Sequence, residues 1–167
     1  MEVFLYSDGS SRGNPGPGGF GTILRCTDAQ GQVHEKEFSA AYACTTNNRM
    51  ELLGVITGFE ALKRPCSVVV VSDSQYVIKA FTDHWINSWQ ARGWKNAKKE
   101  PVKNVDLWKR LLRAIEPHTV TWQWVKGHNE HPENERCDAL ACAAADSGEF
   151  LHDAEYEASL APQQTFI

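Results

Sequence analysis

Two acidic residues each follow a short apolar run in the sequence. Asp8 comes directly after residues 3–7, and Asp73 comes directly after residues 67–72. Runs of this length and composition predict buried strands. If the two strands are parallel neighbours, both carboxylates lie at the carboxyl end of the sheet, where open α/β sheets place their ligand crevice. We therefore expect Asp8 and Asp73 to act together.

Two more acids accompany predicted helices. Glu51 leads into apolar residues with helical spacing over 52–62, and Asp138 lies beside the apolar stripe of a helix that begins near Pro132. Each of these two acids can also be explained without a role in a functional site. Glu51 would complete a capping box if Asn48 were the N-cap, and an acid beside a stripe is usually a surface residue. A carboxylate on the flank of either stripe can also point into the fold.

Four carboxylates in one place need a cation. Asp8, Glu51, Asp73 and Asp138 all lie where a helix-covered sheet would converge. Their mutual repulsion would raise their pKa values, and bound divalent cations remove this difficulty. An oxygen-only donor set suits Mg²⁺ or Mn²⁺ rather than zinc. Two such ions about 4 Å apart would stabilise the attacking water and the leaving oxygen in phosphodiester cleavage.

A polar loop after a predicted strand at 119–125 contains His128 and His131. Their spacing can serve zinc, but the sequence offers no second pair that would complete such a site. A histidine in a polar, glycine-containing loop is more often mobile than a metal ligand. We therefore expect no zinc site here.

The elements that must position these residues begin with strands. Residues 3–7, 20–25 and 33–41 predict a three-stranded antiparallel meander, because the connections between them are short. The other predicted elements are strands at 67–72 and 119–125 and helices at 52–62, 74–81, 105–115 and from 132 onward. Ser74 or Asp73 would cap the second helix and Asn104 the third. The pattern predicts one α/β domain with a five-stranded, helix-covered sheet.

A glycine motif near the N-terminus has a misleading pattern. Gly16, Gly18 and Gly21 match the Gly-x-Gly-x-x-Gly pattern of dinucleotide-binding proteins. That pattern requires a helix directly after it, whereas residues 20–25 predict a strand. The two prolines among these glycines favour a turn into a hairpin. We therefore expect a hairpin rather than a nucleotide site.

Residues 84–103 combine tryptophans with positive charge. Over residues 92–103 five cations oppose Glu100, a net charge of +4 in a chain of −4, so the remainder carries −8. The local patch decides the attraction for a polyanion. Trp85 and Trp89 are one helical turn apart and could be core residues. The mixed composition favours instead a protrusion that grips a phosphate backbone. Its members are Trp85, Trp89, Arg92, Trp94, Lys95, Lys98 and Lys99.

Length and composition fit one ordinary globular domain. The 167 residues are 42% hydrophobic and 23% charged, without an apolar stretch as long as a membrane span or the basic and apolar start of a signal peptide. Five scattered cysteines without a Cys-x-x-Cys pair indicate neither a disulfide framework nor a zinc cage. We expect a cytoplasmic monomer without a membrane partner, in which the cysteines are small buried hydrophobic residues.

Several ordered motifs resemble bacterial type 1 ribonuclease H, from about residue 2 to residue 147. They lie at residues 6–10, 14–19, 45–51, 72–75, 89–94, 101–108 and 125–138. The resemblance implies a catalytic domain over 1–147 with that family's fold. This fold has a five-stranded mixed sheet, with strands 1–3 antiparallel and strands 4 and 5 parallel, and about four to five flanking helices. It also implies endonucleolytic hydrolysis of the RNA strand of an RNA/DNA hybrid, leaving 5′-phosphate and 3′-hydroxyl ends.

The resemblance also assigns roles to individual positions. Asp8, Glu51, Asp73 and Asp138 match the metal-binding carboxylates of the family, for Mg²⁺ or Mn²⁺. His128 matches a loop histidine that assists proton transfer and product release. Residues expected in the minor groove of the hybrid are Asn14, Asn47, Asn48 and Gln75. Residues expected at a DNA-strand phosphate are Thr46 and Asn104, and Trp85, Trp89 and Trp94 belong with the lysines to the basic protrusion.

Two regions depart from the family's pattern. Cys44 stands where close relatives carry an arginine, two residues before Thr46, and this predicts a weaker grip on the DNA-strand phosphate. Residues 148–167 extend past the last match. They are acidic, and we expect a poorly ordered tail or a short helix there.

Two other functions compete with this interpretation. A non-catalytic module could bind hybrids without cutting them, but this chain has all four acids. A resolvase or integrase catalytic domain uses similar acids, but the basic, tryptophan-rich insertion is not expected there. The sequence therefore favours the metal-dependent ribonuclease.

Overall fold

The computed structural model of the chain describes residues 1–127 and 131–160. One mixed sheet has the strand order β3-β2-β1-β4-β5. Strand β1 pairs antiparallel with β2, which pairs antiparallel with β3, whereas β1, β4 and β5 run parallel. The strands are β1 (Glu2–Ser11), β2 (Gly16–Thr27), β3 (Val33–Thr45), β4 (Ser67–Ser72) and β5 (Thr119–Trp124). The predicted five-stranded mixed sheet is confirmed.

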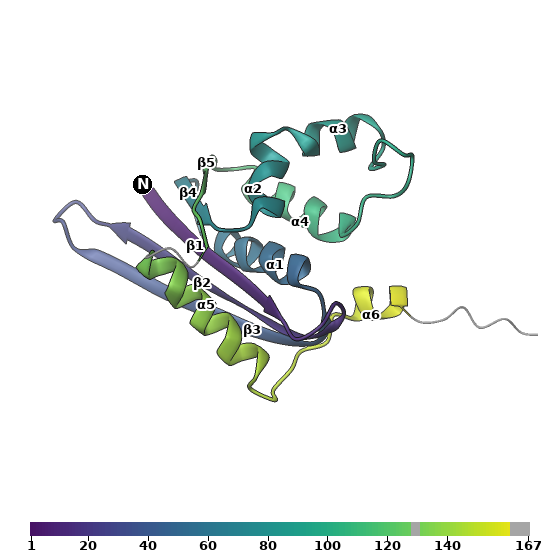
Figure 1. Cartoon of the computed structure of the whole chain (residues 1–167). Coiled ribbons are helices and arrows are strands. Elements are labelled where there is room, and N and C mark those ends of the chain that lie inside the picture. The colour runs from purple at the N-terminus through teal and green to yellow at the C-terminus, as the bar shows by residue number, and fades with distance from the viewer. Residues whose placement is uncertain (128–130, 161–167) are drawn as a thin grey trace, which may run out of the picture.

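Helices cover both faces of this sheet (Figure 1). They are α1 (Asn47–Glu60), α2 (Gln75–Thr82), α3 (Trp85–Ala91), α4 (Val105–Ile115), α5 (Pro132–Ala145) and α6 (Ala154–Leu160). Helices α1, α2 and α4 lie on one side and α5 on the other (Figure 1). Among the described residues, no helix combines the length and apolar character that a membrane crossing requires.

The larger part of the core lies between the sheet and α1, α2 and α4. Trp108, Phe59 and Leu5 are among its fully buried side chains. A smaller cluster under α5 contains Ile23 and Cys137. The five cysteines are free, and two of them, Cys66 and Cys137, are buried. The hydrophobic contacts on both faces fix α1 and α5 against the central strands.

Strand β1 is longer than the apolar run predicted. It continues to Ser11 because its residues pair antiparallel with β2 as far as Ser11 and Gly18. Asp8 therefore lies inside β1, and its expected position at the end of a strand was wrong. The parallel ladder between β1 and β4 does stop at Ser7 and Ser72. Asp8 and Asp73 directly follow these two serines in the chain, Asp8 within β1 and Asp73 just after β4, so both lie at the carboxyl end of the parallel ladder.

The start of α1 also differs from the prediction. Thr46, not Asn48, is the N-cap, and its Oγ1 accepts a hydrogen bond of 3.2 Å from the backbone nitrogen of Arg49. The capping-box interpretation of Glu51 was therefore wrong, because the helix begins two residues earlier than expected.

The caps of the two following helices also differ in chemistry. Ser74 caps α2 as predicted, since its Oγ accepts from Val77 N at 3.2 Å. Asn104 occupies the N-cap position of α4 with a left-handed φ of 62°, but its side chain makes no capping hydrogen bond. Instead, its side-chain amide donates to the Tyr76 hydroxyl and accepts from Arg49.

A buried arginine joins three helices. Arg49 in α1 is only 2% exposed, and its guanidinium donates two hydrogen bonds to Asp106 of α4, at 3.0 and 2.8 Å. It donates two more to Asp153, just before α6, at 2.9 and 2.7 Å. A fifth, longer bond reaches Asn104 Oδ1 at 3.3 Å. One cation thereby satisfies two carboxylates and fixes the C-terminal segment on the domain.

We predict that Arg49→Ala lowers the free energy of unfolding by about 3–5 kcal/mol, because Asp106 and Asp153 lose their common partner in a largely buried setting. Urea denaturation at neutral pH measures this loss. Arg110→Ala is the matched control. Its pair with Glu60 is as short, at 2.7 Å, but the two side chains are 44% and 41% exposed. It should cost less than about 1 kcal/mol. Equal losses in the two variants would contradict the structural role of Arg49.

Candidate active site

Three carboxylates meet at the carboxyl end of the parallel ladder. One oxygen from each of Asp8, Glu51 and Asp73 lies within 4.8 Å of the others. Asp8 is 7% exposed, and the other two are half-buried. The structure thus brings together three of the four acids that the sequence pointed to, from a strand, a helix and the loop after a second strand.

Glu51 reaches this cluster because α1 lies very close to β1. Gly9 makes the approach possible, since a Cβ atom there would lie 2.6 Å from the backbone nitrogen of Glu51. Asn47 Nδ2 donates to Glu51 Oε1 at 3.0 Å, and Ser74 Oγ donates to Oε2. These two bonds, one from the first residue of α1 and one from the N-cap of α2, fix the orientation of the Glu51 carboxylate within the cluster.

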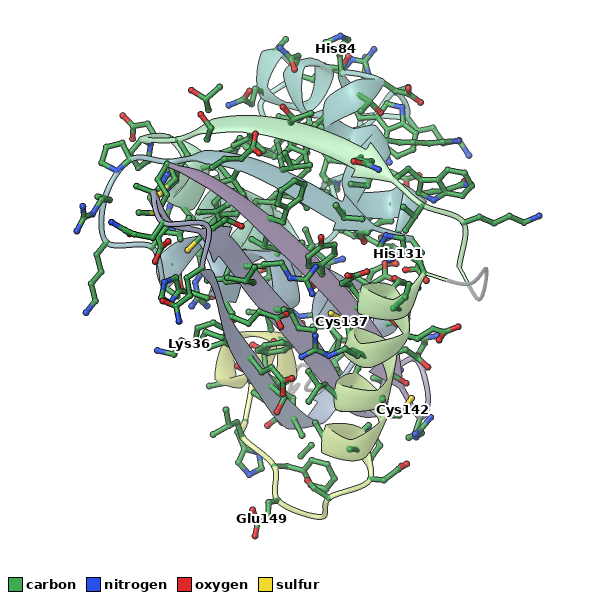
Figure 2. The ribbon with its side chains drawn as sticks, turned by 90° about the vertical axis from the view of Figure 1, so that its left-hand side faces the viewer. Lys36, His84, His131, Cys137, Cys142 and Glu149 are labelled. Carbon is green, nitrogen blue, oxygen red and sulfur yellow. The ribbon has the colours of Figure 1, made fainter. Side chains whose placement is uncertain are left out.

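Asp138 comes to the cluster from the opposite face. Helix α5 lies along the sheet, with Cys137 on the side that faces the strands (Figure 2). Gly21 of β2 permits this contact, because a Cβ there would lie 2.5 Å from the carbonyl oxygen of Cys137. Asp138 is half-buried and close enough to Asp8 to raise the pKa of that residue. It lies beside the three-carboxylate cluster rather than within its 4.8 Å limit.

The electrostatics of the cluster favour protonation when no cation is bound. Burial, with a smaller contribution from the negative charges of Asp73 and Asp138, raises the pKa of Asp8 from 3.8 to about 8. Burial and Asp73 raise the pKa of Glu51 to about 7, against the opposing effect of the hydrogen bonds from Ser74 and Asn47. Such clusters of acids with raised pKa values are typical of functional sites.

The donor set fits a hard divalent cation. The cluster offers carboxylate oxygens alone, which are the ligands that Mg²⁺ and Mn²⁺ prefer. A bound cation would also stabilise the charged form of each acid. His128 lies outside the described residues. His131 caps α5, where its Nδ1 accepts from Asn134 N at 3.2 Å, so its ring has a structural function.

Two groups around Asp73 were not found from the sequence. A Cβ atom on Gly127 would lie 2.8 Å from Asp73 Oδ2, so this glycine leaves room for the carboxylate. The indole of Trp124 donates to the Asp73 carbonyl at 3.0 Å and is 44% exposed. The only signal in the sequence was the position of Gly127, two residues after the predicted strand at 119–125. Its contact with Asp73 depends on the pairing of β4 with β5.

Five of the six residues expected in the minor groove or at the DNA-strand phosphate lie around one hollow of about 610 Å³. Its lining consists of Asn14, Thr46, Asn47, Asn48, Lys103, Asn104 and Tyr156. Five of these were predicted from the resemblance. Lys103 was counted only within the basic stretch, and Tyr156 was missed because the tail lay beyond the matching motifs. Gln75 is not in the lining; it is exposed at the first residue of α2.

The basic stretch stands out from the sheet as α3 and the loop after it (Figure 1). Lys95, Lys98 and Lys99 are exposed, as is Arg92. Trp89 is half-buried, and its ring centroid lies 5.3 Å from that of the core residue Trp108.

The other two tryptophans of this stretch differ in exposure. Trp94 packs on the core in the same way as Trp89, whereas Trp85 is 38% exposed. The sequence left open whether Trp85 and Trp89 are core residues or parts of a protruding surface. Trp89 packs on the core, whereas the ring of Trp85 is exposed.

Comparisons with known proteins agree with this geometry. The family model for RNase H matches residues 1–146. Ribonuclease H of Lachnoclostridium phytofermentans is 59% identical over 154 residues, which cover 92% of this chain and 98% of that protein. The crystal structure of LC9-RNase H1, a type 1 RNase H with the type 2 active-site motif, matches with a TM-score of 0.80 and 32% identity, over 97% of this chain and 82% of that chain.

A more distant structure shows the fold alone. LC11-RNase H1, solved in complex with an RNA/DNA hybrid, matches with a TM-score of 0.60 at 24% identity, over 87% of this chain and 97% of that chain.

The raised pKa values predict an unusual pH dependence of stability. Between its ordinary pKa of 3.8 and its folded pKa of about 8, Asp8 binds more protons in the folded state than in the unfolded state. The free energy of unfolding of the metal-free protein should therefore fall as pH rises through this window, by several kcal/mol. Asp8→Asn should flatten the fall and leave the metal-free protein at least as stable at neutral pH. Chemical denaturation in excess chelator across the window measures both.

Added Mg²⁺ supplies the control for this pH profile. Because the cation stabilises the charged carboxylates, it should raise the melting temperature more at about pH 8 than at about pH 5. The same Mg²⁺ effect at both pH values, or a large loss of stability in Asp8→Asn, would contradict the repulsion argument.

Gly127→Ala should disturb Asp73 without touching the core. The added methyl group would lie 2.8 Å from Asp73 Oδ2, so the carboxylate must turn. We expect at least about tenfold weaker binding of Mg²⁺, with little change in the metal-free melting temperature. Isothermal titration calorimetry with Mg²⁺ measures the affinity.

Proposed function

The chain belongs to the RNase H family, and we propose that this ribonuclease H cuts the RNA strand of RNA/DNA hybrids with bound Mg²⁺ or Mn²⁺. The cleavage is endonucleolytic and leaves 5′-phosphate and 3′-hydroxyl ends. The observation that carries this proposal is the meeting of Asp8, Glu51 and Asp73 within 4.8 Å. A module that only bound hybrids would have no use for buried acids that repel one another.

Each acid has a distinct part in this proposal. Asp8 is close to both Asp73 and Asp138 and is the most buried of the cluster, so it would be the central carboxylate among the residues that hold the cations. Glu51 is held in one orientation by Asn47 and Ser74, so it would bind without further ordering. The cations, when bound, would supply an activated water and stabilise the charge on the leaving oxygen.

Residues around the acids would orient the scissile phosphate. Gly127 and Trp124 fix the side chain and backbone of Asp73. Asp138 approaches from α5, on the opposite face of the sheet from Glu51, so the acids would hold the cations from two sides. The role of His128 in proton transfer and product release remains a proposal from the resemblance.

The hollow beside the acids supports recognition of a hybrid. Its amide side chains, Asn14, Asn47 and Asn48, can donate to and accept from 2′-hydroxyls and base edges in a minor groove. Asn47 also donates to Glu51, so the recognition surface is continuous with the acids. The exposed cations after α3 and the Trp85 ring would hold the backbone farther along the duplex.

We propose a cytoplasmic monomer as the working form.

Cleavage of defined duplexes tests this function. We expect hybrid to be cut in Mg²⁺, and duplex RNA and duplex DNA to remain intact. Excess chelator should stop the reaction, and Asp8→Asn should reduce turnover below detection while it leaves hybrid binding largely unchanged. The fragment downstream of each cut should accept a radioactive 5′-phosphate from polynucleotide kinase only after phosphatase treatment. Cleavage of duplex DNA, or of hybrid in chelator, would overturn the proposal.

A further inference from the structure

The hollow beside the acids has the composition of an anion site. Its seven lining residues include one cation, Lys103, and no carboxylate, in a chain whose net charge is −4. Hydroxyl groups of Thr46 and Tyr156 and four asparagine side chains complete the lining. Hydrogen-bond donors next to a single cation suit a phosphodiester, which offers acceptor oxygens and one negative charge.

Several donors in this lining already have partners. Asn47 Nδ2 donates to Glu51, and Asn104 Nδ2 donates to the Tyr76 hydroxyl at 3.1 Å. Within the described part of the chain, no hydrogen bond uses the hydroxyl protons of Thr46 and Tyr156 or the ammonium of Lys103. Together with the side-chain amides of Asn14 and Asn48, which donate no hydrogen bond within the described residues, these three groups are donors that a bound anion can use without breaking an existing bond.

Tyr156 is held at the hollow by the buried arginine. The Arg49 guanidinium lies 4.7 Å from the centre of its ring, and Arg49 also binds Asp153. Asp153 Oδ1 in turn accepts from the backbone nitrogen of Tyr156 at 3.2 Å. The same guanidinium holds Asn104 on the far wall. One group thus fixes two walls of the hollow relative to each other.

The C-terminal segment is tied to the sheet before it reaches the hollow. Leu151 N donates to Ala41 O at 2.8 Å, and Ala43 N donates to Leu151 O at 3.0 Å. These bonds extend the edge of the sheet beside β3, immediately before Cys44. The segment that carries Tyr156 is therefore docked on the strand that leads to Cys44 and Thr46.

Cys44 lies on β3 next to Ala43, whose backbone nitrogen donates to Leu151 of the segment that carries Tyr156. Burial is the largest cause that raises the pKa of Tyr156, and the Cys44 thiol is the next. The phenol therefore stays protonated and able to donate at neutral pH. Cys44 is the position where the resemblance leads us to expect an arginine. The C-terminal segment thus adds a hydroxyl donor to the hollow that Thr46, two residues after Cys44, also lines.

We propose that Tyr156 donates a hydrogen bond to a phosphodiester of the hybrid's DNA strand, in place of the arginine that Cys44 replaces. The inference rests on the proposed function, because it takes the hybrid as the ligand. It makes the C-terminal segment a part of the substrate-binding surface. Tyr156 is a positioning residue, so its removal should act on binding and leave the chemical step unchanged.

Tyr156→Phe is the direct test. It keeps the ring over Arg49 and removes only the hydroxyl, so the melting temperature should not change. Steady-state cleavage of a fluorescent hybrid in Mg²⁺ should show KM raised about tenfold and kcat unchanged, as for the loss of one hydrogen bond to a charged group. Tyr42→Phe is the matched control. Tyr42 lies on β3 beside Leu151 but not in the lining of the hollow, and its KM should stay at the wild-type value.

Two further measurements identify the partner of the hydroxyl. In the first, a single neutral methylphosphonate replaces the phosphate at successive positions of the DNA strand of the hybrid. At one position, this replacement should weaken binding of the wild type about tenfold but hardly change binding of Tyr156→Phe. Cys44→Arg should restore most of the lost affinity in the Tyr156→Phe background, because a guanidinium can donate to the same phosphate.

The outcomes separate this inference from the proposed function. If the wild type does not cut hybrid, the proposed function fails. If the wild type cuts hybrid and Tyr156→Phe has the KM and the methylphosphonate profile of Tyr42→Phe, the inference alone is overturned. A changed kcat with an unchanged KM would also overturn it, since a positioning contact to the DNA strand acts on binding.

Discussion

Repulsion among the carboxylates of Asp8, Glu51 and Asp73 is the constraint on which the rest of the structure depends. Their oxygens lie within 4.8 Å, and burial raises the pKa values of Asp8 and Glu51 further. Apolar burial on both faces of the sheet offsets this cost and holds the backbone of each acid in place. A divalent cation relieves the same repulsion. The feature that destabilises the free protein is therefore the source of its proposed affinity for metal ions.

Close contacts between elements decide which acids join the cluster. Parallel pairing places Asp8 and Asp73 side by side, but Glu51 depends on the missing side chain of Gly9. Gly21 has the same effect for α5 and so for Asp138. The glycines that matched a nucleotide motif thus include one that permits a helix to pack on a strand. Their use is steric, and the hairpin prediction for this segment is confirmed by the pairing of β1 with β2.

Arg49, in the first turn of the helix that carries Glu51, is a buried charge that is fully neutralised by ion pairs. One buried cation there satisfies Asp106 and Asp153 and supports Asn104 and Tyr156 around the hollow. Helix α1 therefore carries an uncompensated acid, Glu51, two residues after a fully compensated base. The pairing stabilises the fold where no ion is needed, while the acid cluster leaves its charge to be neutralised by a ligand.

Local patterns sufficed for much of the fold and for the acids. Apolar runs predicted β4, and the helical spacing predicted α4 and α5 within a residue or so, because these elements bury one continuous face. Capping failed for α1, since two neighbouring polar residues, Thr46 and Asn48, compete for one position and only the helix geometry selects between them. The extent of β1 was missed because its last residues are polar and are held by pairing with β2.

The amino-acid sequence by itself determined the class of protein and the order of its elements and predicted four candidate acids, since these depend on residue type and local spacing. Tertiary structure alone decided that Asp8, Glu51 and Asp73 share one site, that Asp138 stands beside it and that Tyr156 joins the hollow. Each of these contacts joins residues far apart in the chain. Their distances are set by strand register and by how closely helices pack, which no local pattern specifies.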